Sequence, residues 1–344
     1  MAAREDKLIE LLSRFEELGI GQQIDYDKFY LYSLITHSTA IEGSTVTEVE
    51  NQLLFDEGIS ARGRSMAEQL MNLDLKAAYE QSIAYAKAHT EISTNLLKGL
   101  SALVMKNTGQ IYNTPLGSFS AATGDLRLLN VTAGVGGRSY MNYAKVPQKL
   151  AEFCTMLNAQ RQAFSQKDII ERYMVSFDAH YLLVTIHPWA DGNGRMARLL
   201  MNQLQFESGL LPTKISRDRK AEYIEALVET RETDDLTVFR QFMVDEHIRN
   251  IEQMIREYQQ SIEQTDVPVN VPVNVPVKIT ARQQQILGLM SQDQTITIQE
   301  LSKSLSVTER TIRRDITNLK EQRRLQRIGS DKNGHWAVQQ LSVN

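Results

Sequence analysis

One stretch of twelve residues, from His187 to Arg198, constrains the fold of this chain more than any other. It reads His-Pro-Trp-Ala-Asp-Gly-Asn-Gly-Arg-Met-Ala-Arg. Apolar residues recur at helical spacing before it, from Ile169 to Val184, and again after it, from Leu199 to Phe206. The pattern therefore predicts a helix, a tight glycine-containing loop and a second helix, with the polar residues gathered in the loop.

The loop and the start of the second helix carry residue types that suit a bound polyphosphate. Gly192 and Gly194, with Asn193 between them, let the backbone approach a ligand closely and adopt positive φ angles. The following helix start offers unpaired N–H groups and the positive end of a dipole. Arg195 and Arg198 are three residues apart, so they share one helix face, and guanidinium groups match phosphate oxygens in pairs.

Two further residues of the stretch suggest chemistry as well as binding. Asp191 is placed to hold a hard cation such as Mg²⁺, which keeps few protein ligands beside substrate phosphates. His187 titrates near neutral pH and can act as a general base. The alternative is a solvated glycine-rich loop with a structural histidine and two surface arginines, but so many suitable residue types close together favour a phosphate site.

The stretch resembles the signature of the Fic family, His-Pro-Phe-x-Asp/Glu-Gly-Asn-Gly-Arg-x-x-Arg, and departs from it at one fixed position, where Trp189 replaces phenylalanine. The resemblance implies transfer of AMP from ATP to a tyrosine, threonine or serine hydroxyl of a protein. It also implies a role for each residue: His187 as general base, Asp191 as the Mg²⁺ ligand, Gly192, Asn193 and Gly194 as an anion hole, and Arg195 and Arg198 as phosphate ligands.

A second match lies far upstream, at the end of a predicted helix over residues 27–42. Ser38-Thr39-Ala40-Ile41-Glu42-Gly43 resembles the Fic inhibitory motif, Ser/Thr-x-x-x-Glu-Gly/Asn. The resemblance implies that Glu42 pairs with Arg198 and occupies the place of the ATP γ-phosphate, where the carboxylate repels an anion. Without the signature, Glu42 would read as a solvated carboxylate at a helix end.

The segment 111–147, rich in Gly, Thr and Asn, precedes the signature. Residues 123–127 and 131–143 alternate in a way that predicts a small hairpin. In Fic proteins a hairpin flap at this place binds the target segment by strand addition. Resemblance alone puts four flap residues against the nucleotide: Ser139, Tyr140, Met141 and Asn142. A long surface loop is the alternative.

Tyr223 lies in a stretch, residues 221–227, that resembles the family segment whose tyrosine lines the adenine pocket. Its spacing equally fits a residue of an amphipathic helix. A final long helix is predicted over roughly residues 238–263.

Composition places the chain among globular proteins, with 42% hydrophobic and 23% charged residues, and 344 residues suggest about two domains. The charged N-terminus lacks the apolar run of a secretory signal, and no uncharged apolar run approaches a membrane span. The single cysteine, Cys154, sits in an apolar run and is expected in the core. We therefore expect a cytoplasmic protein without membrane contact.

Charge and composition change near residue 265. Val and Asn alternate around Pro268, Pro272 and Pro276, which favours a semi-rigid extended linker over residues 265–278, with an edge strand as the alternative. The segment from Lys278 to the last residue contains 11 Lys and Arg and 6 Asp and Glu, which gives a net charge of +5. The remainder contains 27 basic and 36 acidic residues, which gives a net charge of −9. The basic segment thus reads as a module with its own partner.

This module predicts three helices and a hairpin over residues 325–338, which resembles a DeoR-like winged helix-turn-helix. In its third helix Ile312, Ile316 and Leu319 form an apolar stripe. The opposite face carries the candidate DNA-binding residues Arg310, Arg313, Arg314 and Thr317. A winged helix that binds protein through a solvated basic face remains the alternative.

The sequence thus predicts a mainly α protein: a Fic-type helical core with a small β-hairpin flap, plus a C-terminal winged-helix domain. The expected segments are N-terminal helices over 1–110, including the inhibitory helix at about 27–43, a catalytic core over 111–264 with the flap at about 123–147, the linker over 265–278, and the winged helix over 279–344. A self-inhibited adenylyltransferase using ATP and Mg²⁺ on a protein target, which could be the chain itself, is the favoured function. Alternatives are removal of AMP at the same site, and a DNA-binding regulator whose Fic part senses nucleotide. A homodimer that shares helix faces is also open.

Overall fold

The computed structural model describes residues 2–133, 138–263, 281–305, 307–321, 324–328 and 335–338. Its contacts divide the chain into two compact units, Met1–Val269 and Asn270–Asn344. Both units are mainly helical, with short antiparallel hairpins, so the predicted fold class is confirmed. The helices before residue 110 belong to the same compact unit as the signature.

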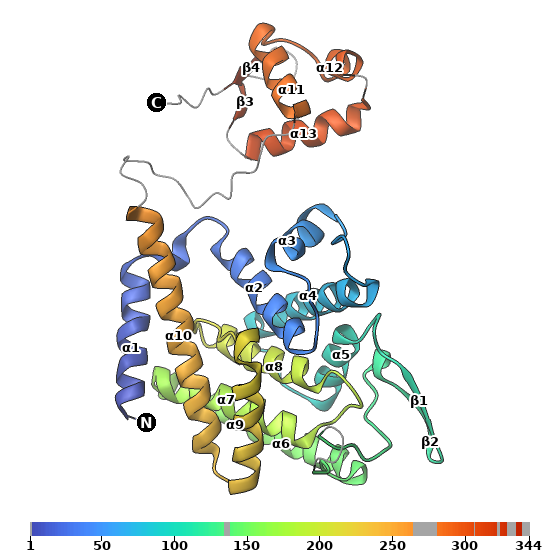
Figure 1. The fold of residues 1–344 in the computed structure, drawn as a ribbon, viewed down its shortest axis with the longest axis vertical. Coiled ribbons are helices and arrows are strands. Elements are labelled where there is room, and N and C mark those ends of the chain that lie inside the picture. Colours follow the sequence, from blue (N-terminus) through green and yellow to red (C-terminus); the bar gives the residue numbers. More distant parts are fainter. Residues whose placement is uncertain are drawn as a thin grey trace. The chain divides into compact units, whose positions relative to one another are not determined.

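The larger unit is built from ten α-helices and one hairpin within its described residues, with short 3-10 turns between them (Figure 1). In chain order these elements are α1 (Ala2–Glu17), α2 (Tyr26–Ile41), α3 (Glu48–Glu57), α4 (Met66–Lys87), α5 (Thr94–Val104), β1 (Ile111–Thr114), β2 (Gly117–Ser120), α6 (Val146–Gln162), α7 (Ile169–Ile186), α8 (Asn193–Glu207), α9 (Lys220–Thr233) and α10 (Leu236–Glu263).

Helices α7 and α8, which flank the signature loop, form the centre of this unit. Helix α7 starts with a capping box between Asp168 and Glu171, which satisfies free N–H groups at its first turn. Helix α8 is buried over most of its length, including polar side chains. Among these, Asn202 accepts a hydrogen bond from the Tyr79 hydroxyl and donates one to the Thr213 carbonyl. Hydrogen bonds of this kind let a polar helix lie in the core.

The outer helices enclose this centre on all the sides that Figure 1 shows. Helices α1 and α10 lie side by side, and Arg4 pairs with Asp245 across them at 2.7 Å. The Tyr30 hydroxyl of α2 donates to the Pro212 carbonyl at 2.6 Å, which joins the N-terminal helices to the segment after α8. Burial of Cys154 in α6 confirms its predicted place in the core.

A buried polar network anchors the end of α2 that leads to Glu42. Asn72 of α4 accepts hydrogen bonds from the Thr39 hydroxyl at 2.7 Å and from the Asn51 amide at 2.9 Å. Its own amide donates to Ser44 at 3.2 Å. Since Asn51 lies on α3 and Thr39 on α2, the network connects three helices at one buried point.

The position of the hairpin corrects the sequence-based expectation. The paired strands are β1 and β2, with Ile111 opposite Ser120, and they project from the body of the unit (Figure 1). Within the predicted flap, 123–147, the described residues contain one antiparallel bridge, between Thr132 and Ser139. Residues 123–127 form no strand because Gly124 turns the chain at φ 71° and the Arg127 side chain binds nearby carbonyls instead.

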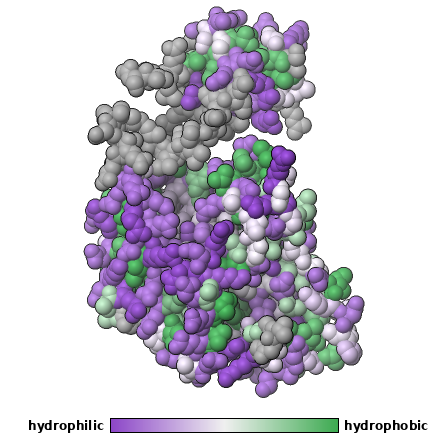
Figure 2. Space-filling view, viewed as in Figure 1, coloured by the Kyte–Doolittle hydropathy of each residue, from purple (hydrophilic) through white to green (hydrophobic). Residues whose placement is uncertain are grey.

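The surface of the larger unit is mostly polar. Figure 2 shows hydrophilic side chains over most of the face that α1 and α10 form. Hydrophobic side chains gather on the projecting hairpin, where Ile111 is 71% and Leu116 60% exposed. No described helix combines the length and the apolar character that a membrane crossing requires.

The smaller unit contains α11 (Ala281–Gln292), α12 (Ile298–Ser304), α13 (Glu309–Glu321), β3 (Leu325–Ile328) and β4 (His335–Val338). The predicted hairpin is confirmed, with Leu325 opposite Val338 and Ile328 opposite His335. The predicted stripe is also buried: Ile312, Ile316 and Leu319 pack with Trp336 in a separate core. The predicted linker and the turn at 329–334 lie outside the described residues.

The network around Asn72 predicts a stability effect. Asn72→Ala should lower the free energy of unfolding of the larger unit by roughly 1–3 kcal/mol, because buried groups on Thr39, Asn51 and Ser44 lose a partner. Urea denaturation followed by circular dichroism measures this. Gln148→Ala, on the exposed side of α6, is the control and should change stability by less than about 0.5 kcal/mol. Equal effects of the two substitutions would contradict the importance of the network.

Candidate functional site

The signature loop is fixed by its own side chains. Helix α7 ends at His187, whose backbone adopts the left-handed conformation with φ 52° and ψ 62°. Trp189 is fully buried, and its indole N–H donates to the Gly124 carbonyl at 3.2 Å. The Asn193 side chain exchanges two hydrogen bonds with the Trp189 backbone, at 3.1 and 2.8 Å. Trp189 therefore anchors the loop, and Asn193 closes it into a turn.

The glycines of the turn are required by space and by conformation. Gly192 has φ 82°, and a Cβ atom there would lie 2.8 Å from the Met105 sulfur. A Cβ atom on Gly194 would lie 2.6 Å from Glu42 Oε1 and 3.1 Å from Arg198 Nη1. The start of α8 is thus in close contact with the end of α2.

Both signature arginines are buried on one face of α8. Arg195 is 2% exposed and its Nη2 lies 3.0 Å from the Met105 sulfur and 3.6 Å from Asp191 Oδ1. Arg198 is 3% exposed. Arg195 Nε and Arg198 Nη1 are buried without a hydrogen-bond partner among the described residues. Both guanidinium groups thus keep hydrogen-bonding capacity beside the glycine turn, although Tyr223 also interacts with Arg198.

Arg198 is bound by the end of α2, as the inhibitory resemblance implied. Its Nε donates to the Ser38 hydroxyl at 2.8 Å, and its Nη2 donates to the Ser38 carbonyl at 3.0 Å and to Glu42 Oε1 at 2.5 Å. Burial alone would raise the pKa of Glu42, but the charge and hydrogen bond of Arg198 outweigh it, so the pKa lies below its ordinary value. Gly43 follows with φ 105° and ends the helix.

His187 is held as a neutral imidazole. Its Nδ1 lies 3.2 Å from the Val184 carbonyl, which only accepts hydrogen bonds, so Nδ1 carries the hydrogen and Nε2 keeps its lone pair. Burial lowers the pKa of His187 to about 4; the Val184 carbonyl opposes this, the Arg127 charge adds to it, and the Glu42 charge opposes it. A neutral imidazole with a free Nε2 can accept a proton at pH 7.

The four predicted flap residues have different surroundings. Tyr140 stacks on the His187 ring, with centroids 3.8 Å apart and an interplanar angle of 18°. The guanidinium carbon of Arg231 lies 5.6 Å from the centroid of the Tyr140 ring. Met141 packs against the core. Ser139 pairs with Thr132, and Asn142 caps the short turn after it. Tyr140 is thus the flap residue that contacts the signature.

Sequence reasoning missed Arg127, whose side chain touches the signature loop. Its Nε donates to the His187 carbonyl at 2.7 Å, and its backbone N–H donates to the Pro188 carbonyl at 3.0 Å. The signal in the sequence was a single arginine inside the apolar run Leu126-Arg127-Leu128-Leu129. A buried arginine in such an apolar run needs hydrogen-bond acceptors, and here backbone carbonyls, including that of His187, supply them.

Tyr223 lies close to the arginines but has no open surface. It is 2% exposed, and its hydroxyl lies 3.0 Å from His180 Nε2. Phe239 and Phe242 pack around its ring. Its predicted contact with adenine stays a prediction.

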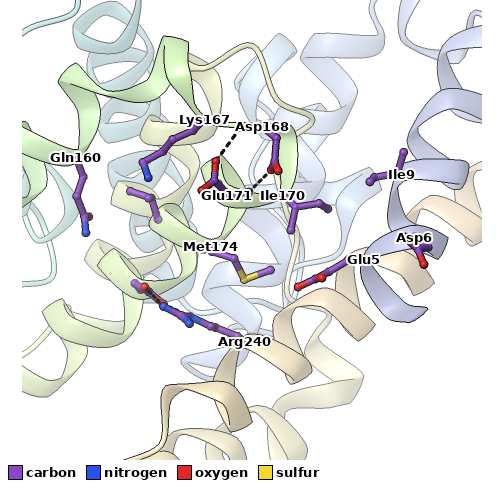
Figure 3. Close-up of a pocket in the computed structure, with 12 residues that line it drawn as sticks. Glu5, Asp6, Ile9, Gln160, Lys167, Asp168, Ile170, Glu171, Met174 and Arg240 are labelled. Carbon is purple, nitrogen blue, oxygen red and sulfur yellow. Dashed lines mark hydrogen bonds and ion pairs between the residues drawn. The ribbon is translucent and has the colours of Figure 1, made fainter. Parts of the chain in front are cut away.

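A hollow of about 500 Å³ lies elsewhere on the unit, between α1, the start of α7 and α10 (Figure 3). Its lining includes Glu5, Asp168, Glu171 and Arg240, and the dashed lines in Figure 3 mark the Asp168–Glu171 capping box. None of the predicted site residues lines this hollow. The candidate site is therefore defined by the signature, not by this cavity.

Asp191 is the predicted metal ligand, and its side chain is 59% exposed. Its Oδ1 accepts the Gly192 N–H at 2.6 Å. The described ranges contain no group of three or more His, Cys, Asp or Glu side chains arranged to hold a metal ion. A cation at Asp191 would thus need phosphate oxygens and water as its other ligands, which suits Mg²⁺.

The predicted DNA-binding residues all lie on α13. Arg314 is exposed. The side chains of Arg310, Arg313 and Thr317 lie outside the described residues.

Comparison with known proteins agrees with these motifs. Residues 91–205 match the Fic/DOC family, and residues 282–329 match the DeoR-like helix-turn-helix domain. Protein adenylyltransferase fic-1 of Caenorhabditis briggsae is 29% identical over 203 residues, which are 58% of this chain and 36% of that protein. Protein adenylyltransferase Fic of Culex quinquefasciatus is 29% identical over 243 residues, which are 70% of this chain and 45% of that protein. The chain thus spans less than half the length of these relatives.

Solved structures share the fold. Fic-1 from C. elegans has a TM-score of 0.58 at 24% identity, covering 76% of this chain and 74% of that one. A Fic family protein from Desulfovibrio desulfuricans has a TM-score of 0.59 at 17% identity, covering 100% of this chain and 97% of that one.

The pairing of Glu42 with Arg198 predicts a pH-dependent contribution to stability. The pKa of Glu42 lies below its ordinary value of 4.5, so its stabilisation is present above pH 4.5 and is lost as the pH falls through the folded-state pKa. Glu42→Gln should therefore lower the free energy of unfolding at pH 7 by on the order of 1 kcal/mol, because the carboxylate is partly exposed.

Thermal unfolding of both proteins between pH 7 and pH 3 measures this difference, which should shrink below pH 4.5. Glu225→Gln, at an exposed position of α9, is the control. A Glu42→Gln difference that stays constant across this range would argue against the ion pair.

Proposed function

Because this chain carries a Fic/DOC domain, we propose that it is a self-inhibited protein adenylyltransferase, which transfers AMP from ATP to a hydroxyl group of a protein. The relatives named protein adenylyltransferase support this proposal. The observation that carries it is the binding of Arg198 by Glu42 and Ser38 directly beside the glycine turn. A buried guanidinium next to an anion-binding turn suits a phosphate, and a carboxylate at the same guanidinium competes with that phosphate.

In the proposed reaction the target hydroxyl attacks the α-phosphate, its proton passes to His187 Nε2, and pyrophosphate leaves. The neutral His187 with its hydrogen on Nδ1 supports this role. The N–H groups at the start of α8 and the donors of Arg195 and Arg198 would bind the phosphate oxygens. Asp191 would hold Mg²⁺, which neutralises phosphate charge when bound.

The inhibited state follows from the same contacts. The Glu42 carboxylate neutralises Arg198 and lies against the position of a Gly194 side chain. An ATP γ-phosphate placed there would meet a like charge and a guanidinium already in use. Loss of the Glu42 carboxylate should therefore favour productive binding of ATP.

The same site could also remove AMP from a modified protein, with Glu42 orienting a water molecule for attack on the phosphate. Its carboxylate is 34% exposed at the site and kept ionised by Arg198, which supports this second candidate. The two activities differ in the effect of Glu42: it opposes AMP transfer but would assist AMP removal.

We expect Glu42→Gly to raise AMP transfer at least tenfold, because it removes the carboxylate that competes with phosphate. His187→Ala in the Glu42→Gly protein should lower the rate by about 10²–10⁴, the usual contribution of a general base. Incubation with Mg²⁺ and ATP labelled at the α-phosphate, followed by electrophoresis, measures label on the chain itself and on added proteins.

ATP labelled at the γ-phosphate is the matched control, since AMP transfer leaves no label from that position. Label from the α-phosphate that is unaffected by His187→Ala would contradict the assigned base. Absence of label in Glu42→Gly would contradict the transferase. Release of AMP from a modified protein by the unchanged chain, but not by Glu42→Gly, would then favour AMP removal.

For the smaller unit we propose duplex DNA as the partner. The match to a DeoR-like helix-turn-helix domain, the net charge of +5 from residue 278 onward and the exposed Arg314 on α13 support this proposal. A winged helix that binds a protein has no phosphate backbone to contact, so its binding would not depend on these basic side chains in the same way.

Replacing Arg313 and Arg314 by alanine should weaken binding of the chain to duplex DNA and flatten its dependence on salt. If both arginines contact phosphates, the slope of log affinity against log salt should fall by roughly 2. Fluorescence anisotropy with a labelled duplex of mixed sequence at several salt concentrations measures the slope. Lys149→Ala combined with Lys145→Ala removes the same charge from the larger unit and should leave the slope unchanged. Salt-independent binding, or none, would exclude the DNA proposal.

A further inference from the structure

Arg127 is a buried cation that lies in the loop between β2 and α6. The residue is 1% exposed. Its guanidinium donates to three backbone carbonyls: from Nε to His187 at 2.7 Å, from Nη1 to Leu129 at 2.7 Å, and from Nη2 to Met141. Its backbone N–H donates to the Pro188 carbonyl at 3.0 Å. One side chain therefore connects the signature loop to both ends of the segment that contains Tyr140.

The contacts with His187 and Pro188 act on a strained part of the backbone. His187 is a non-glycine residue in the left-handed conformation, with φ 52°. This conformation costs roughly 1–2 kcal/mol for an L-residue and persists where its surroundings determine it. Two hydrogen bonds from Arg127 to the carbonyls of His187 and Pro188 fix the two peptide groups that follow the imidazole-bearing carbon.

Arg127 also brings positive charge close to the imidazole. The ion pairs of the described residues include none with Arg127, so only carbonyl dipoles compensate its charge among the contacts found. Burial lowers the pKa of Arg127 itself, and the Arg127 charge adds to the effect of burial in lowering the pKa of His187. A guanidinium remains charged at pH 7 even so, because its ordinary pKa is far above neutrality.

The third carbonyl links Arg127 to the ring that covers the imidazole. Met141, whose carbonyl accepts from Arg127, follows Tyr140 directly in the chain. The Tyr140 ring stacks on His187 at a centroid distance of 3.8 Å. Arg127 thus fixes both members of the stack through their backbones, the imidazole from one side and the tyrosine from the other.

We propose that Arg127 is a positioning residue for the base: it fixes the orientation of His187 and holds the Tyr140 segment against it. The role for catalysis rests on the proposed AMP transfer, but the hold of Arg127 on His187 does not. A guanidinium suits this task because its rigid, planar donors reach three carbonyls at once, whereas a lysine ammonium is a single point charge.

Two variants separate charge from geometry. Arg127→Gln removes the charge, so the pKa of His187 should rise from about 4, while burial, the larger cause, still holds it below its ordinary 6.5. Arg127→Lys keeps a charge but loses the fork of donors, so the titration of His187 should stay low while catalysis falls. In the Glu42→Gly background we expect both variants to lower kcat at least tenfold and to raise KM for the protein target, because the imidazole and the Tyr140 segment are less well fixed.

The matched control is Arg161→Gln. The Arg161 side chain is 7% exposed and also donates to a backbone carbonyl, that of Thr90, but it pairs with Glu207, and its hydrogen bonds reach none of the signature residues. It should lower stability without moving the His187 titration or changing the ratio of kcat to KM beyond the loss of folded protein.

Nuclear magnetic resonance of imidazole-labelled protein between pH 7 and pH 3 measures the His187 titration directly. The chain has six histidines, and the signal that disappears in His187→Gln identifies the relevant one. This readout needs no transfer of AMP. If Glu42→Gly proves inactive, the proposed function fails while the titration still decides the role of Arg127. A His187 titration in Arg127→Gln equal to that in Arg161→Gln would overturn the inference.

Discussion

The burial of Arg198 is the constraint on which the site depends. A guanidinium that is 3% exposed must be compensated, since an unpaired buried charge costs several kcal/mol. Ser38 and Glu42 supply that compensation from a helix more than 150 residues away in sequence. In the proposed function an ATP phosphate would do the same. In that proposal regulation and folding would share one interaction, in which a phosphate replaces the Glu42 carboxylate at Arg198.

The position of Glu42 in turn depends on packing around α2. Its carboxylate can reach Arg198 because the polar network of Asn72 fixes the last turn of that helix. Such a network tolerates small displacements of its side chains less well than apolar packing does, because each hydrogen bond needs a partner at a defined angle. A ligand or protein that perturbs α3 or α4 would therefore act on Glu42 through these hydrogen bonds.

Much of this was predictable from local pattern. The helical periodicity on both sides of the signature and the buried stripe of α13 depend on neighbours in sequence, and the structure confirms them. The contact between Glu42 and Arg198 came from family resemblance. The predicted hairpin over 123–143 is present only in part: Thr132 bridges Ser139 and the Tyr140 N–H donates to the Val131 carbonyl, whereas Gly124 turns the chain and residues 123–127 form no strand. The role of Arg127 depends on contacts with residues 60 positions apart, which spacing alone does not encode.

Gly194 has a consequence for how this chain can evolve. A side chain at that position would collide with Glu42 and crowd Arg198. It would therefore disturb both the pairing of Glu42 with Arg198 and the glycine turn. An unregulated but working descendant is therefore not accessible through position 194. In the proposed function it is accessible through position 42, where the backbone has an ordinary conformation with φ −86° that other residues can adopt. If the proposed inhibition operates, one substitution at the end of α2 removes it, whereas a substitution at Gly194 damages the turn as well.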